Sequence, residues 1–593
     1  MGCLFGYCGR PAEGLSERMA DILTHRCQKG WEKTRLPLKD DYVVEIGHGR
    51  GPLSLDSHVA SLPERELAFG YSGVFFNAAE VFHTKAASAS DLLRSANGNA
   101  EHQLQALEGA FVSAFARGDE TLLIRDAAGV KVIYWNLNPE RLVFASEIKA
   151  LFADPAVPRK MRVRALPEYL TFSFIPGEHT MFEDIYELQP GTTLTCHHGD
   201  VSLRRHFVFE NMEWNEKENR TEKEYAARVR SDLEESVREC ITANHGNPPA
   251  IFLSGGIDSS AVAAIAAREF PDVPLKTFSV HFGPEYANEN DFVSMMTDRY
   301  NTDHTWLEIR PSKFVKQMRD IIWRLDDPIG DPITVPNFLL ARAASRVSGM
   351  VLNGEGGDPC FGGPKNIPMM LASLYGPPPG ETSDRWLERT YLFTYRKCFD
   401  DLHRILTPDV IRDSFGREGL AAIITPFLES DVPRHFLNKL MAVNIRLKGA
   451  NLILVKVDKM TSANAVLALP PLFSKRIIET SMACPPNLKL VGNIEKGILK
   501  KAVEDIVPYP IIARPKSGMM VPVRFWLRGE MRRYAKKVLS KKNLRRLGFF
   551  NTSYVRNLLN YDRSEIQSYR YGLKLWMLIT FMFWYEQMIE GRR

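Results

Sequence analysis

The sequence has no strong excess of charge of either sign, although it is 593 residues long. Its 76 lysines and arginines nearly balance its 71 aspartates and glutamates, which leaves a net charge of +5. A surplus this small over so long a chain argues against nucleic acid as a partner. Hydrophobic residues make up 45% of the chain and charged residues 25%, which is typical of a folded globular protein and excludes a disordered or fibrous one.

Long apolar runs and paired cysteines are also missing. The longest apolar run, 575–585, has about half of the ~20 residues that a membrane-spanning helix needs, so we expect no membrane span and a buried helix there. The eight cysteines lie at scattered spacings without CxxC pairs. This pattern argues against zinc ribbons and disulfide scaffolds, and it predicts a cytoplasmic protein.

Short apolar or alternating segments, separated by glycine and asparagine, dominate the first third of the chain and predict stacked β-sheets. Leu104, Leu107, Phe111 and Phe115 recur at helical spacing, so a helix is predicted over 101–116. The predicted strands are 42–46, 67–76, 121–125, 130–135 and 141–145.

A polar stretch over 209–224 marks a boundary, and two domains are therefore predicted, 1–210 and 223–593. Beyond the boundary, apolar strands alternate with helices, which is typical of a parallel α/β sheet. The segment 384–593 is expected to be mostly helical. The predicted strands of this second domain are 250–253, 275–282, 305–309 and 349–352, with helices over 225–244 and 261–269.

Two glycine-rich loops each end a predicted strand of this sheet. The first is SGGIDSS, residues 254–260, at a strand–helix junction where backbone N–H groups and a helix N-terminus favour an anion. It lacks the Gly-Lys-Ser/Thr end of a Walker loop. The second is NGEGGD, residues 353–358, followed by FGG. Ligands of open α/β sheets bind at the carboxyl ends of strands, so Asp258 and Asp358 are candidates to share one Mg²⁺ on a triphosphate. The alternatives are a capped glycine turn and a loop of solvated acids.

These loops resemble the ATP site of the asparagine synthetase family. Further segments are similar to bacterial members of that family, in collinear order through nearly the whole chain. They are DAAGVKVIY at 126–134, FASEIKAL at 144–151, the segment 169–188, KVDKM at 456–460, the segment 486–490 and RPKSGMMVPVRFWLRG at 514–529.

The resemblance implies an N-terminal αββα Ntn-hydrolase-like domain of the glutamine amidotransferase type 2, followed by an α/β ATP-binding synthetase domain. It implies an enzyme that activates a carboxylate with ATP, releases pyrophosphate, and couples the acyl-adenylate to an amine. Glu355 matches the glutamate near the attacking amine, and Lys516 matches the lysine that stabilises developing negative charge. Asp258 and Asp358 match the Mg²⁺ ligands. The matching ATP and pyrophosphate residues are Ser254, Gly255, Gly256, Asp258, Ser259 and Ser260.

The N-terminal domain departs from the family at its glutaminase site. Gly2 stands where glutamine-dependent members have their nucleophilic cysteine, and Cys3 stands one position later. Ser72, before Gly73, replaces the asparagine that donates to the oxyanion. Arg50 and Asp91 match glutamine-binding positions, although a Gly-Pro insertion follows Arg50. We predict no, or very weak, glutaminase activity; the alternative is a translation start that makes Cys3 the first residue.

The synthetase domain departs from the family as well. Leu467, Leu469 and Ser474 replace three charged residues, and Pro359 and Pro364 replace acidic and aromatic ones. We therefore expect an acceptor pocket remodelled for something larger or more apolar than aspartate.

The predicted function is that of a peptide macrolactam cyclase of the lasso type, or more broadly an enzyme acting on a peptide or small-molecule carboxylate. A leader-peptide-binding or protease partner would accompany a peptide substrate. The alternatives are a glutamine-hydrolysing asparagine synthase and a non-catalytic binding scaffold. Retention of both glycine-rich loops, Glu355 and Lys516 argues against the scaffold.

Overall fold

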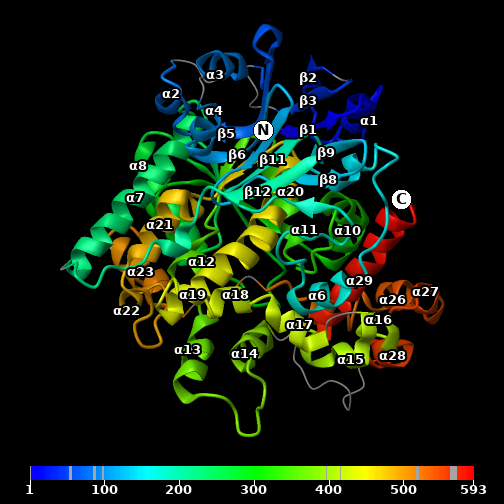
Figure 1. The fold of residues 1–593 in the computed structure, drawn as a ribbon. Coiled ribbons are helices and arrows are strands. Elements are labelled where there is room, and N and C mark those ends of the chain that lie inside the picture. Colours follow the sequence, from blue (N-terminus) through cyan, green and yellow to red (C-terminus); the bar gives the residue numbers. More distant parts are fainter. Residues whose placement is uncertain are drawn as a thin grey trace.

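The computed structural model describes residues 2–39, 41–51, 57–84, 88–96, 99–218, 220–395, 397–413, 416–515, 518, 520–560 and 571–592. Across these ranges, every helix is too short or too polar to span a bilayer. Two stacked sheets occupy one end of the molecule, and a larger part with a third sheet and most of the helices occupies the other (Figure 1).

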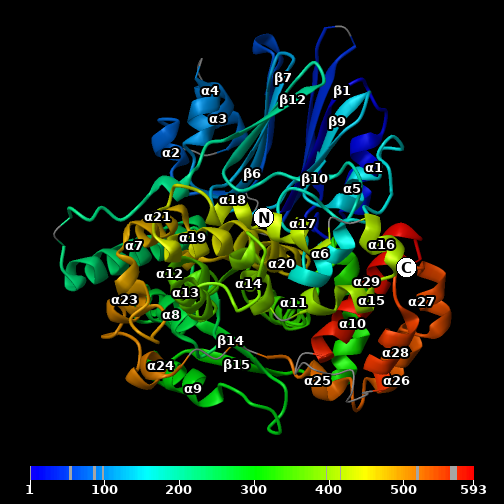
Figure 2. The same cartoon turned by 60° about the horizontal axis from the view of Figure 1, so that its bottom comes forward.

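The N-terminal part is a sandwich of two antiparallel sheets, ordered β10-β8-β9-β1-β3-β2 and β12-β11-β7-β6-β5-β4. Figure 2 shows the two sheets face to face. Leu4 and Ile46 of the first sheet meet Ala114 and Leu123 of the second between them. The strands are β1 (Gly2–Gly9), β2 (Trp31–Pro37), β3 (Val43–Arg50), β4 (Val59–Leu62), β5 (Leu67–Phe75), β6 (Gly109–Arg117), β7 (Glu120–Arg125), β8 (Tyr134–Leu137), β9 (Arg141–Ala145), β10 (Tyr186–Glu187), β11 (Thr192–His197) and β12 (Asp200–Arg205).

Helices cover both outer faces of this sandwich, which completes four αββα layers. On the first sheet, α1 (Leu15–Ile22) and α5 (Ile148–Leu151) pack over Phe5 and Tyr7. On the second sheet, α2 (Ala78–Val81), α3 (Ala89–Ser95) and α4 (Ala100–Gln105) pack over Phe69 and Phe111. The predicted layer order of the N-terminal domain is confirmed.

The helix predicted over 101–116 is wrong beyond Gln105. α4 ends there, and the chain continues as β6. Phe111 and Phe115 are both buried against α3, as the prediction required, but they do so from a strand. Residues four apart share one face in a strand as well as in a helix, so this spacing does not separate the two structures.

The strand predicted over 130–135 begins only at Tyr134. The preceding residues form a turn around Asp126, whose carboxylate accepts hydrogen bonds from the backbone N–H groups of Gly129, Val130 and Lys131 at 2.6, 2.9 and 2.9 Å. Those N–H groups are therefore not available to a strand ladder.

The C-terminal part contains a parallel five-stranded sheet, ordered β15-β14-β13-β16-β17. Ile251 and Leu352 face α7 and α8 on one side, whereas Ala250 and Val351 face α11 and α20 on the other. Side chains alternate between the faces of a strand, so both faces of this sheet need apolar residues. The strands are β13 (Ala250–Phe252), β14 (Lys276–His281), β15 (Asp303–Glu308), β16 (Met350–Leu352) and β17 (Leu467–Leu469).

Helices surround this sheet and form most of the remaining chain, as predicted. The longest, α7, begins with a capping box in which Thr221 and Glu224 each bond the other's backbone N–H. The helices next to the sheet are α7 (Glu222–Ala243), α8 (Ile257–Glu269), α9 (Asn290–Arg299), α10 (Pro311–Leu325), α11 (Thr334–Ala344), α12 (Gly357–Phe361), α20 (Val455–Ser462), α21 (Lys475–Ala483), α22 (Pro486–Lys489) and α23 (Gly497–Ala502).

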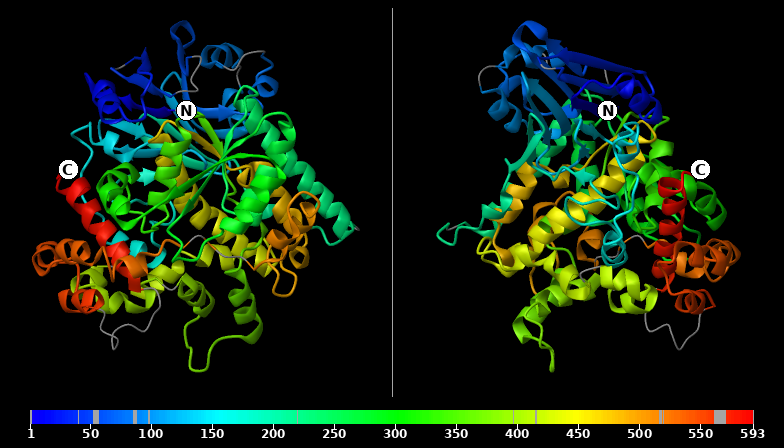
Figure 3. Two further views of the ribbon diagram at one scale, coloured as in Figure 1. Left: turned by 180° about the vertical axis from the view of Figure 1, so that it is seen from behind. Right: turned by 45° about the vertical axis from the view of Figure 1, so that its right-hand side comes forward.

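The remaining helices include α13 and α14 at the bottom of Figure 1 and α26, α27 and α28 near the C-terminal helix on its right; Figure 3 shows the molecule from two further sides. They are α6 (Ala165–Phe172), α13 (Asn366–Tyr375), α14 (Trp386–Tyr395), α15 (Leu402–Ile405), α16 (Pro408–Asp413), α17 (Gly416–Ala422), α18 (Thr425–Leu428), α19 (Phe436–Val443), α24 (Tyr509–Ala513), α25 (Val523–Trp526), α26 (Arg532–Val538), α27 (Lys541–Leu547), α28 (Thr552–Asn560) and α29 (Tyr571–Trp584). Short 3-10 turns cover Pro63–Arg65, Phe209–Asn211, Phe399–Asp401 and Pro471–Phe473, and π-helical turns cover Asn444–Leu454 and Tyr585–Ile589.

The apolar run 575–585 lies almost entirely in α29, and its side chains are buried, as predicted. This helix joins distant segments of the chain. The Trp584 indole N–H donates to the Asp326 carbonyl at 2.6 Å, and the Tyr169 hydroxyl donates to the Met577 carbonyl at 2.9 Å.

Buried charges connect the two parts of the molecule. Arg26 Nε lies 2.7 Å from Glu147 Oε1, and Arg26 Nη2 lies 3.0 Å from Asp458 Oδ2 in α20. The same Asp458 carboxylate receives Lys131 Nζ at 2.5 Å. All four side chains are almost fully buried. The contact between the sandwich and the second part therefore contains oriented ion pairs as well as apolar surface.

Candidate active site

The loop 254–260 connects β13 to α8 at the carboxyl end of the sheet. Gly255 has a φ of 69°, in the left-handed region, and a Cβ there would lie only 3.0 to 3.2 Å from the chain at the start of α9. Glycine is therefore required both for the turn and for the close packing. The Ser259 hydroxyl accepts from the Ser254 N–H at 3.0 Å, which closes the loop on itself.

The N-terminus of α8 presents its first N–H groups beside this loop. Gly256 is the residue before the helix, and it has no side chain with which to cap these donors. Ser260 lies deeper: its N–H donates to the Gly256 carbonyl at 3.0 Å, and its side chain is fully buried. The loop thus combines helix N–H groups and serine hydroxyls, which is a suitable arrangement for an anion.

The second loop, 353–358, follows β16 and packs directly on the first. A Cβ on Gly354 would lie 2.4 Å from the Ser259 backbone nitrogen, and one on Gly357 would lie 2.1 Å from Asp258 Oδ1. Since β13 and β16 are parallel neighbours, their carboxyl ends meet at one edge of the sheet. The structure brings Asp258 and Asp358 together there.

A lysine that sequence reasoning missed lies between these two carboxylates. Lys496 Nζ is 2.6 Å from Asp258 Oδ2 and 2.5 Å from Asp358 Oδ1, and its side chain is fully buried. Lys496 precedes α23, with a φ of 59° in the left-handed region. No spacing pattern connects it with either loop, so only the tertiary structure assigns it to this site.

A cavity of about 310 Å³ opens beside the two loops. Both polar and apolar side chains line it. Beyond the two loops, the polar lining residues include Asp331, Lys448, Lys456 and Glu289, and the apolar ones include Ile333, Leu340, Leu452, Ile453 and Val457. Glu355 and Pro359 also line it, so both predicted residues reach the cavity.

Lys456 and Asp331 form an ion pair in this cavity, with 2.7 Å between Nζ and Oδ2. Burial opposes the charge on Lys456, but Asp331 and Glu355 together raise its pKa above the ordinary value. Burial likewise opposes the charge on Asp331, but Lys456 lowers the pKa of that carboxyl. The lysine therefore stays a cation at neutral pH and is available to an anionic group, not as a base.

Comparison with known proteins identifies the family. The family model described as Asparagine synthase matches residues 228–586, which is more than half of the chain, and the Glutamine amidotransferase domain model matches residues 73–207. The chain belongs to the asparagine synthase family. This result confirms the resemblance and the two-domain fold class, and it makes the protein an ATP-dependent amide-forming ligase.

The sequences of several known proteins align with most of this chain. It is 28% identical to asparagine synthetase [glutamine-hydrolyzing] 1 of Bacillus subtilis over 79% of this chain and 75% of that protein. It is 24% identical to amidase chry2 of Gibberella zeae, over 80% of this chain and 77% of that protein. It is 25% identical to amidase chyE of Penicillium rubens, over 75% of this chain and 74% of that protein.

Lys516 lies outside the described residues of this family member. Of the described residues near it in sequence, Gly518 lines the cavity, and Arg514 pairs with Glu289, another lining residue. The Arg514 guanidinium also lies over the Phe292 ring, 4.2 Å from its centroid.

The prediction that Leu467, Leu469 and Ser474 form a wall of the acceptor pocket is wrong. Leu467 and Leu469 belong to the edge strand β17 and are buried in the core, away from the cavity lining. Ser474 caps α21 by accepting from the Ile477 N–H at 3.3 Å. Of the two prolines, Pro359 lines the cavity and Pro364 is not among the lining residues. The apolar residues that line the cavity come instead from the segments around α11 and α20, which the sequence comparison over 467–474 did not identify.

In the glutaminase-like part, Gly2 pairs with Arg50 across β1 and β3. Cys3 points toward α1, into a cluster with Leu15 and Met19, whereas the next residue, Leu4, points between the two sheets. Adjacent residues of a strand face opposite sides, so the Cys3 thiol is directed away from the side that Gly2 faces.

The Cys3 thiol lies over Gly49 and meets the Cys27 thiol, with 3.7 Å between the sulfur atoms. Burial and the neighbouring Cys27 raise the pKa of Cys3 well above the ordinary value. A thiol of raised pKa is a poor nucleophile, because the thiolate is the reactive form.

The other predicted glutaminase residues lie on separate elements. Ser72 and Gly73 are in β5, and the Asp91 carboxylate bonds the Ser88 hydroxyl at the start of α3. Sequence reasoning missed a buried stack of three aromatic rings. The ring centroids of His48 and His58 lie 4.2 Å apart, and those of His58 and Tyr71 lie 4.4 Å apart. Burial lowers the pKa of His48 to about 4, so this stack is uncharged at neutral pH.

Proposed function

We propose that this ligase closes a macrolactam in a peptide, by the lasso cyclase type of reaction. A side-chain carboxylate attacks ATP, pyrophosphate leaves, and the resulting acyl-adenylate is attacked by the peptide's own amine, with release of AMP. Because both reacting groups belong to one molecule, the attack is effectively unimolecular.

The observation that carries this proposal is the direction of Cys3. A glutamine-dependent ligase needs a reactive thiol to release ammonia, and here the Cys3 thiol points toward α1 with a raised pKa. An amine already present in the substrate removes the need for ammonia. The apolar residues that line the cavity, among them Ile333, Leu340 and Ile453, support a substrate larger and less polar than free aspartate.

Within this proposal, the first loop binds the phosphate chain. The Ser254 and Ser259 hydroxyls, the N–H groups after Gly255 and Gly256 and the N-terminus of α8 face one anion. Ser260 supports this loop from behind, since its side chain is buried.

The two aspartates fit a magnesium ion. They supply the hard carboxylate oxygens that Mg²⁺ prefers, and both already converge on one cation, the Lys496 ammonium. Gly357 leaves the space that lets Asp258 approach the second loop. We assign Asp258 and Asp358 as the residues that would hold Mg²⁺, which when bound would neutralise charge on the departing pyrophosphate.

The remaining roles belong to Glu355 and Lys516. Glu355 accepts the proton that the amine loses as it bonds to the acyl carbon. Lys516 supplies a cation to the tetrahedral oxyanion and the phosphate. A leader-peptide-binding or protease partner delivers the peptide in this proposal.

The alternative is an asparagine synthase that obtains ammonia from glutamine. It is favoured by the relative from Bacillus subtilis, whose name states that activity. The two functions differ in their carboxylate substrate and in the source of the amine.

The test measures ATP–pyrophosphate exchange with free aspartate and with peptides that carry one internal aspartate or glutamate. We expect exchange with a peptide, a product lighter than its substrate by one water, and no glutamate released from glutamine. The N-acetylated peptide is the matched control, because its carboxylate can be activated but its blocked amine prevents ring closure. Exchange with free aspartate, with glutamine turnover abolished in Cys3→Ala, would overturn the proposal in favour of asparagine synthase.

A further inference from the structure

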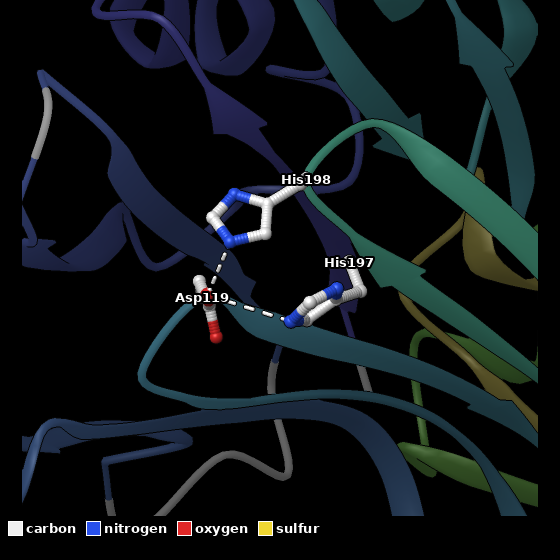
Figure 4. Close-up of side chains that lie close together, drawn as sticks. All are labelled: Asp119, His197 and His198. Carbon is white, nitrogen blue, oxygen red and sulfur yellow. Dashed lines mark ion pairs between the residues drawn. The ribbon is translucent and has the colours of Figure 1, made fainter.

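We propose that Asp119, His197 and His198 form a surface site for a divalent transition metal of the zinc class. This inference does not depend on the reaction proposed above. Within the described ranges, these residues are the group of three whose ligand atoms all lie within 4.8 Å of one another. Figure 4 shows the three side chains converging.

The backbone of two tight hairpins positions these side chains. Gly118 and Asp119 connect β6 to β7, and His198 and Gly199 connect β11 to β12. His198 and Gly199 have φ values of 49° and 86°, as a two-residue type I′ turn requires. Because β11 pairs with β7, with His197 opposite Glu120, the two turns lie side by side at the same end of these strands.

The distances already approach those of a metal site. Asp119 Oδ2 lies 2.6 Å from His198 Nε2 and 3.4 Å from His197 Nε2. In a tetrahedral site with ligand bonds of about 2.1 Å, neighbouring ligand atoms lie about 3.4 Å apart. The Asp119–His197 pair thus already has this separation, whereas Asp119 Oδ2 and His198 Nε2 would have to move apart by about 0.8 Å.

The ligand chemistry selects the metal. Two imidazoles and one carboxylate suit zinc, nickel and copper(II), whereas magnesium and calcium require oxygen ligands throughout. The adjacent Cys196 is not a fourth ligand, because it faces the interior of the sandwich and is buried there. Three protein ligands leave a coordination position open to water or to another molecule.

The site lies away from the synthetase cavity. The opposite end of β11 and β12 contacts the second part of the molecule, where Arg446 donates to the carbonyls of Pro190 and Phe207 at 3.0 Å each. The turn at 197–200 lies at the far end of these strands, about 20 Å away for six extended residues. A metal there therefore acts by joining the two hairpins or by presenting its open position at the surface.

The test is a calorimetric titration of the untagged full-length protein with ZnCl₂, without nucleotide, followed by substitution with Co²⁺. We expect one zinc ion bound and a Co²⁺ visible spectrum of nitrogen and oxygen ligation. Asp119→Asn and His198→Asn should each weaken binding by at least about tenfold, since even supporting residues around a metal cost that much. Asparagine keeps the left-handed backbone at 198.

The control is His102→Ala, which removes an exposed histidine of α4 outside this cluster. It should leave zinc affinity unchanged, and all variants should keep the wild-type melting temperature in metal-free buffer. The proposal is wrong if zinc does not bind, or if binding survives in both Asp119→Asn and His198→Asn. Either result would make the three residues an ordinary surface ion pair.

Discussion

At the residue scale, the candidate site contains buried side chains of opposite charge that form ion pairs. Asp258 and Asp358 meet on Lys496, and Asp331 meets Lys456 across the same cavity. Lys456 lowers the pKa of the buried Asp331 carboxyl, so that carboxylate stays ionised despite its burial. The buried Lys496 thus links the two loops that carry Asp258 and Asp358.

Lys496→Met should destabilise the protein, because it leaves two carboxylates facing each other. Loss of one partner of a buried pair typically costs about 3–5 kcal/mol, and the partial exposure of Asp358 places this variant toward the lower end. Added Mg²⁺ should recover part of the loss by binding both carboxylates. Urea unfolding with and without Mg²⁺ measures both effects. The control is Lys501→Met, an exposed lysine of α23. Equal unfolding midpoints of the wild type and Lys496→Met in Mg²⁺-free buffer would contradict this role.

Lys516→Ala should leave ATP affinity largely intact, because the loop 254–260 and the two aspartates bind the phosphates. It should slow amide formation by about 100- to 1000-fold, which is the usual effect of losing one donor to an oxyanion. The measurement compares ATP affinity with product formation in the variant. Equal losses in both would make Lys516 a nucleotide-binding residue only.

At the element scale, the active site depends on two loops that touch through glycine. The loop after β13 and the loop after β16 approach so closely that Gly354 and Gly357 have no space for a Cβ. Parallel neighbouring strands bring such loops to one edge of the sheet, and the absence of side chains lets the helix N–H groups face the cavity.

Gly357→Ala should separate these loops and weaken ATP binding while the protein stays folded. The new Cβ would lie 2.1 Å from Asp258 Oδ1, and overpacking of this kind typically costs about 1–3 kcal/mol, which corresponds to about 5- to 150-fold in affinity where the cost falls on the ATP-bound arrangement. Gly529→Ala is the control, because a Cβ there would meet only the Phe525 carbonyl oxygen, at 3.5 Å. Calorimetric titration with ATP measures the affinity of both variants. The same ATP affinity in Gly357→Ala and Gly529→Ala would show that the loops adjust to the new Cβ.

At the scale of the whole molecule, the glutaminase-like sandwich is joined to the synthetase part through buried ion pairs. Arg26 reaches Glu147 of its own domain and Asp458 of the other, and Lys131 adds a second cation to Asp458. Such pairs require both domains to be docked in one orientation. The sandwich thus has a structural role in the molecule, although its Cys3 thiol points toward α1.

Arg26→Met should weaken this contact and lower the free energy of unfolding by about 3–5 kcal/mol at neutral pH, because Glu147 and Asp458 lose a buried partner. Chemical denaturation followed by circular dichroism measures the change. Arg10→Met, which removes an exposed partner of Glu140, is the control and should have little effect.

The same contact has a definite pH dependence. Burial raises the pKa of Asp458, but Lys131 and Arg26 outweigh it and hold the pKa well below the ordinary value. Stability from such a group is complete above the pKa of an unfolded aspartate, about 4, and is lost as the pH falls below it. The difference between wild type and Arg26→Met should therefore shrink on acidification. A difference that stays constant down to about pH 2, where the protein remains folded enough to measure, would contradict this linkage.

Some features follow from the sequence alone, because they depend on the order of residues within one short segment. The strand-then-glycine pattern at 250–260 and 349–358 determines two glycine-rich loops at strand ends of one sheet, and the 575–585 run determines a buried helix. Other features have no local signal. Phe111 and Phe115 have a spacing that a helix and a strand share, and the contact with α3 decides for the strand.

Only the tertiary structure assigned Lys496 to the two aspartates, placed Leu467 and Leu469 in an edge strand away from the cavity, and directed Cys3 toward α1. Each of these depends on which distant segments are neighbours, and on which face of a strand a residue occupies. The order of residues determines the elements, but the burial of their apolar faces decides which side chains meet.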